Sequence, residues 1–133
     1  MDYNEFIGHV QHRARLSTRE AAEKAARATL ETFAERLAGG AAHNLSSQLP
    51  ADLAQWMRHN DEQQTYTLQE FFERVAERED AELPEAIHHA RAVFDVLREA
   101  TSEGAMENVI QQLPDDFVEL IQSGSEGDFD LRD

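Results

Sequence analysis

Apolar residues recur three and four positions apart along most of the chain, which is the period of an amphipathic helix. Near the N-terminus, for example, Tyr3, Phe6, Ile7 and Val10 share one helical face. No stretch alternates apolar and polar residues for long enough to form a strand. The pattern therefore predicts an all-α protein.

The pattern also occurs twice. From Ala26 to Met57, the chain matches the segment from Ala90 to Ile121, 64 positions later, with 11 identical residues in 32 positions. Chance would give roughly two or three identities, so we infer a duplication. Nearer the N-terminus the offset is 65, where Glu5, Phe6, Val10 and Arg13 match Glu70, Phe71, Val75 and Arg78. The sequence predicts a tandem duplication of a four-helix unit, with the two halves packed as one compact helical domain around a pseudo-twofold axis.

Capping residues predict where the helices begin. Asp2 and Thr67 are each followed by a glutamate three residues on, which is the spacing of a capping box. The second helix of the first half is expected to begin at Ser17 or Thr18, with Glu20 as a capping partner.

Prolines and glycines predict further boundaries. The second helix is expected to run to Ala38, with Gly39 and Gly40 ending it, and its counterpart is expected to begin at Pro84. In each half a short third helix is followed by a proline, Pro50 or Pro114, and a short fourth helix. The expected organisation is a first repeat over 1–59, a solvated linker over 60–66, a second repeat over 67–122 and a disordered acidic tail over 123–133.

Charge narrows the classes of partner. The chain has 27 acidic and 12 basic residues, a formal net charge of −15, and such a field repels nucleic-acid phosphates and anionic membrane surfaces. No apolar run is long enough to span a bilayer, and the acidic start does not resemble a secretory signal. We expect a cytoplasmic protein with no membrane or direct nucleic-acid partner. The acidity suits either a salt-rich habitat or a basic partner.

Several polar residues are candidate ligand contacts. Arg27 with Glu31, and Arg91 with Asp95, form opposite-charge pairs four residues apart at matching positions of the two halves. The two arginines could converge on an anion, and the alternative is a pair of exposed salt bridges. Trp56 matches Leu120 of the other half, so its indole either completes the core or marks a contact surface.

Histidines and carboxylates suggest metal sites only weakly. Glu85 and His88 have the Glu-x-x-His spacing of di-iron helix bundles, but one such pair on a short helix falls short of that architecture. His9 and His12 could present two ligands on one face, and exposed histidines are the alternative. The chain has no cysteine, phosphate-binding glycine loop, G-x-S-x-G or H-E-x-x-H motif. We therefore assign no catalytic residue, metal or cofactor.

The order of motifs resembles that of the prokaryotic domain of unknown function 2267 family. The matching features are Tyr3 with Glu5 and Phe6, then Arg27-Ala28, Gly40 and Leu49-Pro50, followed by a second Leu-Pro at Leu113-Pro114. The resemblance covers nearly the whole chain up to about Ile121. It implies a helical fold and a soluble prokaryotic protein, and it supplies no catalytic residues.

Three functional hypotheses follow. The first is a non-enzymatic module that binds a partner protein through its helical surface. The second is a small-molecule or metal-binding protein, or an enzyme, with its site between the two repeats near Arg27, Arg91 or the histidines. The third is a nucleic-acid mimic that offers carboxylates to a basic partner.

Overall fold

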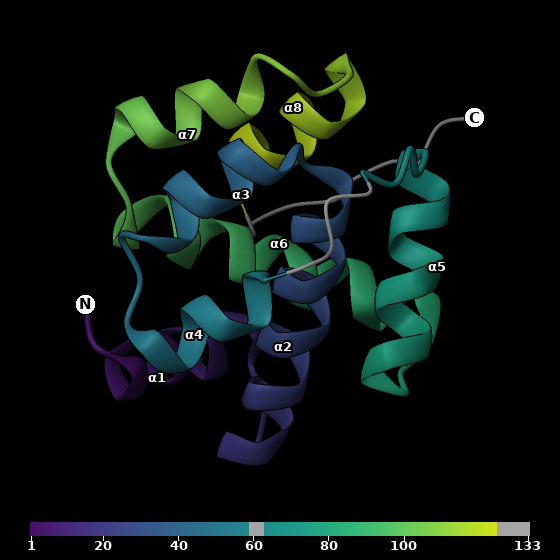
Figure 1. Ribbon diagram of the computed structural model, residues 1–133. Coiled ribbons are helices and arrows are strands. Elements are labelled where there is room, and N and C mark those ends of the chain that lie inside the picture. The colour runs from purple at the N-terminus through teal and green to yellow at the C-terminus, as the bar shows by residue number, and fades with distance from the viewer. Residues whose placement is uncertain (59–62, 125–133) are drawn as a thin grey trace.

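The computed structural model describes residues 1–58 and 63–124, which contain eight α-helices and one 3₁₀ helix (Figure 1). This part contains no strand, so the prediction of an all-α protein is confirmed. The elements are α1 (Tyr3–Ala14), α2 (Arg19–Arg36), α3 (Gly39–Ser46), α4 (Ala51–Ala54), η1 (Gln55–Met57), α5 (Leu68–Glu79), α6 (Leu83–Ala100), α7 (Glu103–Ile110) and α8 (Asp115–Ser123).

Helices α1 and α5 begin with the predicted capping boxes. The Asp2 carboxylate accepts from the Glu5 amide at 2.8 Å, and the Glu5 carboxylate accepts from the Asp2 amide at 3.2 Å. Thr67 and Glu70 make the same reciprocal pair at 3.1 and 3.0 Å. Each box satisfies two amides that a helix start leaves without a partner.

Two predictions about α2 were wrong. Thr18 caps its start by accepting from the Ala21 amide, so Glu20 is an acidic residue of the first turn and not the capping partner. The helix also does not end at the glycines. Leu37 ends it in an extended conformation, which requires no glycine, and Gly39 and Gly40 are the first residues of α3.

Prolines stand at three helix starts, as predicted. Pro84 occupies the first turn of α6, where its missing amide is not needed. Pro50 and Pro114 are the N-cap residues of α4 and α8. The fourth helix of the first half is short and continues as η1.

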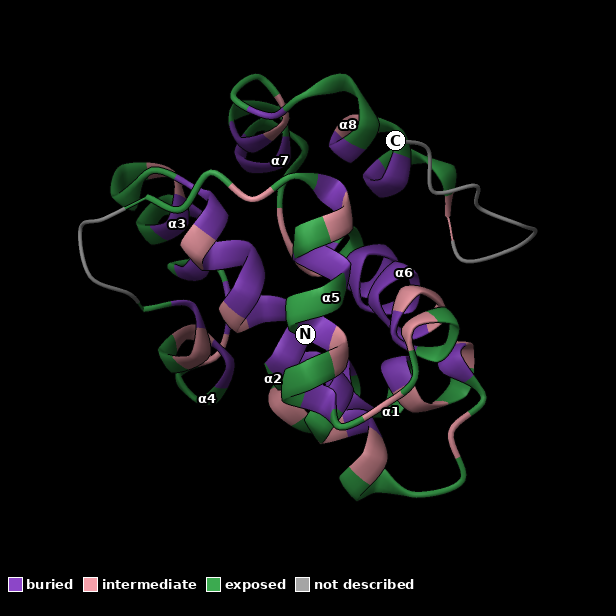
Figure 2. Ribbon diagram, turned by 90° about the vertical axis from the view of Figure 1, so that its right-hand side faces the viewer, coloured by how far each residue is buried: buried purple, intermediate pink, exposed green. Residues whose placement is uncertain are grey.

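Four phenylalanines from both halves form the centre of the core. The Phe71 ring lies 6.5 Å from Phe33, 6.1 Å from Phe94 and 5.6 Å from Phe117, measured between ring centroids. All four side chains are fully buried, and Figure 2 shows the buried residues on the inward faces of the helices. The two halves therefore share one core.

The first helix of each half packs on the long helix of the other half. Helix α1 contacts both α2 and α6, and α5 contacts both α6 and α2. The long helices α2 and α6 also contact each other, as do the short helices α3 and α7 (Figure 1). Helices of each half therefore pack against helices of the other half.

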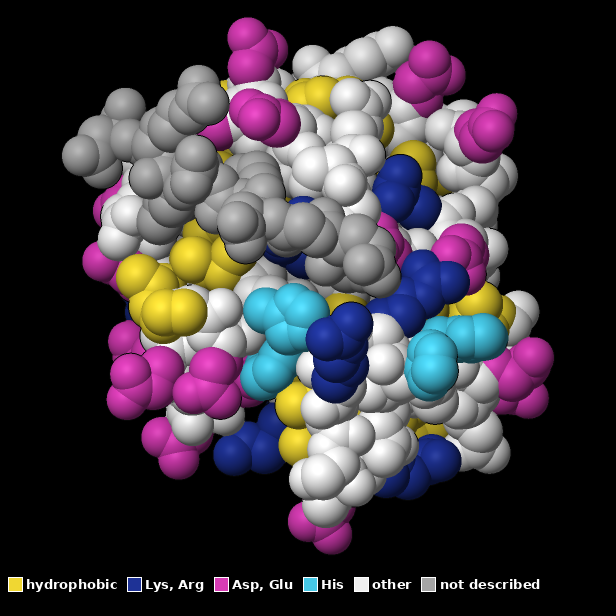
Figure 3. Space-filling model, turned by 180° about the vertical axis from the view of Figure 1, so that it is seen from behind, with side chains coloured by type: hydrophobic (Ala, Val, Ile, Leu, Met, Phe, Trp, Pro, Cys, Tyr) yellow, Lys and Arg dark blue, Asp and Glu magenta, His cyan; other side chains and the backbone are white. Residues whose placement is uncertain are grey.

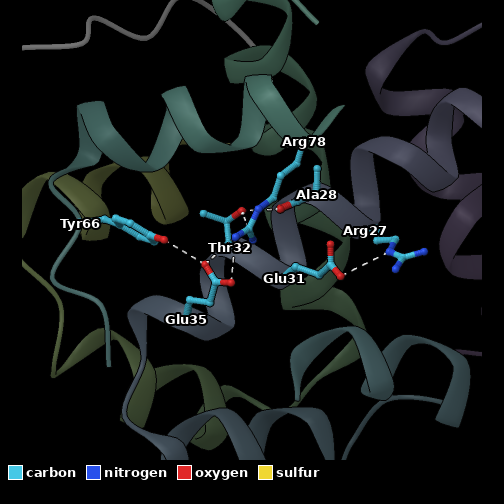
Figure 4. Close-up of polar contacts among 7 residues, drawn as sticks. All are labelled: Arg27, Ala28, Glu31, Thr32, Glu35, Tyr66 and Arg78. Atoms are coloured by element: carbon cyan, nitrogen blue, oxygen red, sulfur yellow. Dashed lines mark hydrogen bonds and ion pairs between the residues drawn. The ribbon is translucent and has the colours of Figure 1, made fainter. Parts of the chain in front are cut away.

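Reciprocal ion pairs join the halves. Arg78 of α5 donates to both carboxylate oxygens of Glu35 in α2, at 2.9 and 3.0 Å. Figure 4 shows how this carboxylate also accepts from the Tyr66 hydroxyl, at 3.0 Å. At matching positions, Arg13 of α1 pairs with Glu99 of α6.

Two glutamines make a second reciprocal contact. The Gln48 side chain accepts from the backbone amide of Ser102, the N-cap residue of α7, at 2.6 Å. The Gln112 side chain accepts from the amide of Ala38, the N-cap residue of α3, at 3.1 Å. Each glutamine therefore satisfies an amide at the start of the other half's short helix.

The predicted domain boundaries lie partly outside the described residues, which omit 59–62 and 125–133. Within the predicted linker, Gln63 donates to the Arg36 carbonyl at 3.0 Å and the Gln64 amide donates to the Glu35 carbonyl at 2.8 Å. Helix α8 reaches Ser123, one residue into the predicted tail. Across the described ranges, no helix is both long enough and apolar enough to cross a bilayer.

Candidate functional site

A groove of about 680 Å³ opens where the turn between α1 and α2 meets the turn between α5 and α6. In Figure 1 the N-terminal end of α2 and the C-terminal end of α5 both lie at the lower edge of the molecule. We call this feature the acidic groove. It is lined by five carboxylates, Glu77, Glu79, Asp80, Glu82 and Glu85, and by Leu16, Ala21, Lys24, Ala76, Ala81 and His89.

Left-handed residues shape both turns at the groove. Asp80 ends α5 with φ 57°, and Arg15 ends α1 with φ 56°. In each turn the next residue donates its amide five residues back, from Ala81 to the Ala76 carbonyl and from Leu16 to that of Gln11, both at 3.0 Å. These tight reversals place the end of α5 against the start of α6.

A buried carboxylate–histidine pair lies at the groove. Glu79, near the end of α5, is 6% exposed, and His89 of α6 is 7% exposed. Glu79 Oε2 contacts His89 Nδ1. The other carboxylate oxygen, Oε1, is buried without a hydrogen-bond partner among the described residues. The Glu79 contact orients the imidazole with its hydrogen on Nδ1 and leaves Nε2 available for another contact.

The matching positions of the first half hold alanines. Glu79 corresponds to Ala14 at the offset of 65, and His89 corresponds to Ala25 at the offset of 64. Both alanines are buried, at 3% and 0% exposure. The same helix pair therefore packs in the first half without any ionisable group at these positions, so packing alone does not explain the Glu79–His89 pair.

The charge of the groove favours a cation. Glu77, Asp80, Glu82 and Glu85 are exposed along its edge, and we call them the rim carboxylates. Of the described residues that line this groove, Lys24 is the one lysine or arginine. A concave site with several carboxylates and a buried, oriented imidazole can bind a positively charged group.

The structure separates the two residues of the predicted Glu-x-x-His pair. Glu85 lines the acidic groove. His88 lies instead beside the end of α1, where the Ala14 backbone is close to its ring. Burial lowers the pKa of His88, and the neighbouring His89 adds to this effect.

The two predicted arginines have different surroundings. Arg27 is exposed, and its Nε donates to Glu31 at 3.3 Å (Figure 4). Arg91 is 5% exposed, and its Nε donates to the Gly124 carbonyl at 2.9 Å. Neither arginine lines the acidic groove. Asp95, the predicted partner of Arg91, accepts from Arg98 at 2.7 Å.

Trp56 is half-buried, so its indole is neither fully part of the core nor fully on the surface, the two alternatives that the sequence left open. Its ring packs edge-on against Tyr3, with the centroids 5.9 Å apart. It also lines a hollow of about 380 Å³ with Glu31, Glu35, Arg58 and Arg78. The Glu35 carboxylate is engaged there by Arg78 and Tyr66, and burial and this hydrogen bond raise the pKa of Tyr66.

The exposed histidines do not gather into a metal site. His9 and His12 lie on the solvent side of α1, and residues 1–58 and 63–124 contain no group of three or more potential ligands placed to hold a metal ion. Figure 3 shows histidines in two groups across the rear face, with lysine or arginine side chains between them and carboxylates toward the edge.

Glu79 and His89 were not predicted as site residues, because they lie on different helices and follow no local motif. The available signal was the comparison between the halves. A glutamate and a histidine that both match alanines on the buried faces of the same two helices mark an ionisable pair in the interior.

Comparison with known proteins establishes the family. No curated protein matches the chain. The model of the family described as "Uncharacterized conserved protein (DUF2267)" matches residues 3–120, a range that includes both halves and every residue that lines the acidic groove. The chain therefore belongs to the DUF2267 family.

Proposed function

We propose that this protein is a binding protein, without catalytic activity of its own, that takes a small cationic ligand in the acidic groove. The observation that carries the proposal is the buried Glu79–His89 pair, which has a carboxylate oxygen without a hydrogen-bond partner in the described residues. Buried polar atoms without partners are costly, and natural proteins retain them mainly where they have a use. A cation in the groove would offset the charge of this carboxylate.

The site lies between two halves that we propose arose by duplication. Supporting observations are the capping boxes at Asp2 and Thr67, the left-handed residues Arg15 and Asp80, and the prolines at 50 and 114. The reciprocal ion pairs and glutamine caps also follow the same offsets. Within this symmetry, the Glu79–His89 pair is an asymmetric addition, as expected of a site that evolved after the duplication.

The proposal is tested by titrating the full chain with n-butylammonium, and separately with butyrate, while recording ¹H–¹⁵N spectra. We expect butylammonium to shift the amide signals of residues 76–89 and butyrate to leave them unchanged. The double variant Glu79→Ala/His89→Ala, which copies the first half, should remain folded and lose the butylammonium shifts. Equal shifts with both ligands, or shifts spread over the whole chain, would refute the proposal.

A basic protein partner is the second candidate. Met1 is the sole large apolar side chain that is exposed in the described residues, so a partner would find little apolar surface to bury. The net charge of −15 favours a partner with a positive surface and disfavours nucleic acid. Binding to such a partner should weaken steeply as salt increases, and salt-independent binding would refute this alternative.

A further inference from the structure

We infer that the ligand of the acidic groove is a linear polyammonium ion, with one ammonium group at His89 and the others at the rim carboxylates. This inference rests on the proposed function, because it names the chemical class of the cation that the groove binds. It follows from how charge, apolar surface and the imidazole are distributed in the groove.

The rim carboxylates are spread along the groove and do not converge. They extend from Glu77 in the last turns of α5 to Glu85 in the first turn of α6. A metal ion needs several oxygen or nitrogen ligands within about 2–2.6 Å of one point, and the described residues hold no group of three that could do this. Separated negative charges suit a cation whose positive charges are also separated.

The groove also has an apolar component. Ala21, Ala76, Ala81 and Leu16 line it together with the carboxylates. Short aliphatic side chains offer contacts to the methylene groups of a ligand, which gain from leaving water. An alternation of ammonium and methylene groups therefore matches the lining better than a compact cation or an aromatic one.

His89 supplies a buried polar contact in the groove. Its Nδ1 is held by Glu79, so Nε2 is the ring nitrogen that remains for a ligand in the groove that His89 lines. A neutral imidazole in this orientation accepts a hydrogen bond at Nε2, and an ammonium N–H is a suitable donor. The Glu79 carboxylate, which accepts from Nδ1, makes Nε2 a stronger hydrogen-bond acceptor, and its negative charge attracts an ammonium group.

Calorimetric titration of the full chain with spermidine tests the inference. We expect one ligand per chain and at least tenfold tighter binding than for n-butylammonium. Glu85→Gln should weaken spermidine binding by about two- to fivefold. The control variant Glu107→Gln removes an exposed carboxylate of α7 outside the groove and should have a much smaller effect.

Lys24 provides a test of opposite sign. It is the one lysine of the chain and lines the groove, so Lys24→Gln should strengthen spermidine binding by about two- to fivefold. Arg58→Gln, which removes a cation outside the groove, is the control. Equal responses of the groove and control variants would show non-specific attraction to an acidic protein and would overturn the inference.

The two proposals fail in different ways. If butylammonium shifts the groove residues but spermidine binds no more tightly than butylammonium, the polyammonium inference is wrong and the cation site stands. If neither ligand affects the groove residues, both are wrong.

Discussion

The Glu79–His89 pair allows a direct test of how the two buried groups depend on each other. The perturbation is a double-mutant cycle with Glu79→Ala, His89→Ala and the double variant. Each single variant leaves the partner buried and without its charged contact, because both residues are buried. The double variant leaves neither group, and it reproduces the residues of the first half, Ala14 and Ala25.

The expected magnitudes follow from the loss of a buried, charge-assisted hydrogen bond. Each single variant should lower the free energy of unfolding by about 2 kcal/mol. The double variant should lower it by only about 1–2 kcal/mol, since replacing a buried pair by apolar residues costs little beyond the lost packing. The coupling energy should therefore be about 2–3 kcal/mol.

Urea denaturation followed by circular dichroism measures all four proteins. The exposed pair of Arg27 and Glu31 provides the control cycle, for which we expect a coupling below about 0.5 kcal/mol. If the Glu79 and His89 variants are additive, the two side chains do not stabilise each other. Glu79 would then not hold the His89 imidazole in a fixed orientation at the groove.

Three further predictions concern other parts of the molecule. Gln48→Ala and Gln112→Ala should each lower the free energy of unfolding by about 1 kcal/mol, because each removes a side chain that caps a helix start in the opposite half. Urea denaturation measures this change, and a decrease below about 0.3 kcal/mol would refute the capping role. Glu35→Gln should move the raised pKa of Tyr66 part of the way back toward 10, because the negative charge of Glu35 is lost while the burial of Tyr66 persists. Ultraviolet absorbance during alkaline titration measures this pKa, and an unchanged value would contradict the prediction. Burial lowers the pKa of His88 in the folded protein, so below pH about 6.5 the unfolded chain takes up a proton at His88 more readily than the folded protein does. The free energy of unfolding should therefore fall as the pH drops. His88→Gln should reduce that fall, as measured by urea denaturation at pH 7 and pH 5.5.

Local chemistry made much of the fold predictable. Asp2 and Thr67 cap amides only three residues away, and Pro84 affects only the turn that contains it. The inward positions of Phe6 and Phe71 follow from helical periodicity alone. Each of these features depends on residues within one or two turns of a single helix.

The site depends on contacts between helices, which periodicity does not encode. Glu85 and His88 have a suggestive spacing, but the rotation of α6 in its packing sends one to the groove and the other toward α1. The functional histidine of our proposal is the next residue, His89, whose partner lies on α5. Similarly, Gly39 and Gly40 were wrongly predicted to end α2, because the extended backbone at Leu37 ends that helix first and the glycines begin α3.

The packing of α1 on α6 has a consequence for synthesis on the ribosome. Helix α1 is complete at Ala14, whereas the helix that covers part of its apolar face begins only at Leu83. At translation rates of roughly 5–20 residues per second, several seconds pass between the synthesis of α1 and the synthesis of α6. The nascent chain therefore exposes part of the apolar face of α1 until α6 emerges, and chaperones that recognise apolar segments can bind that face in the interval.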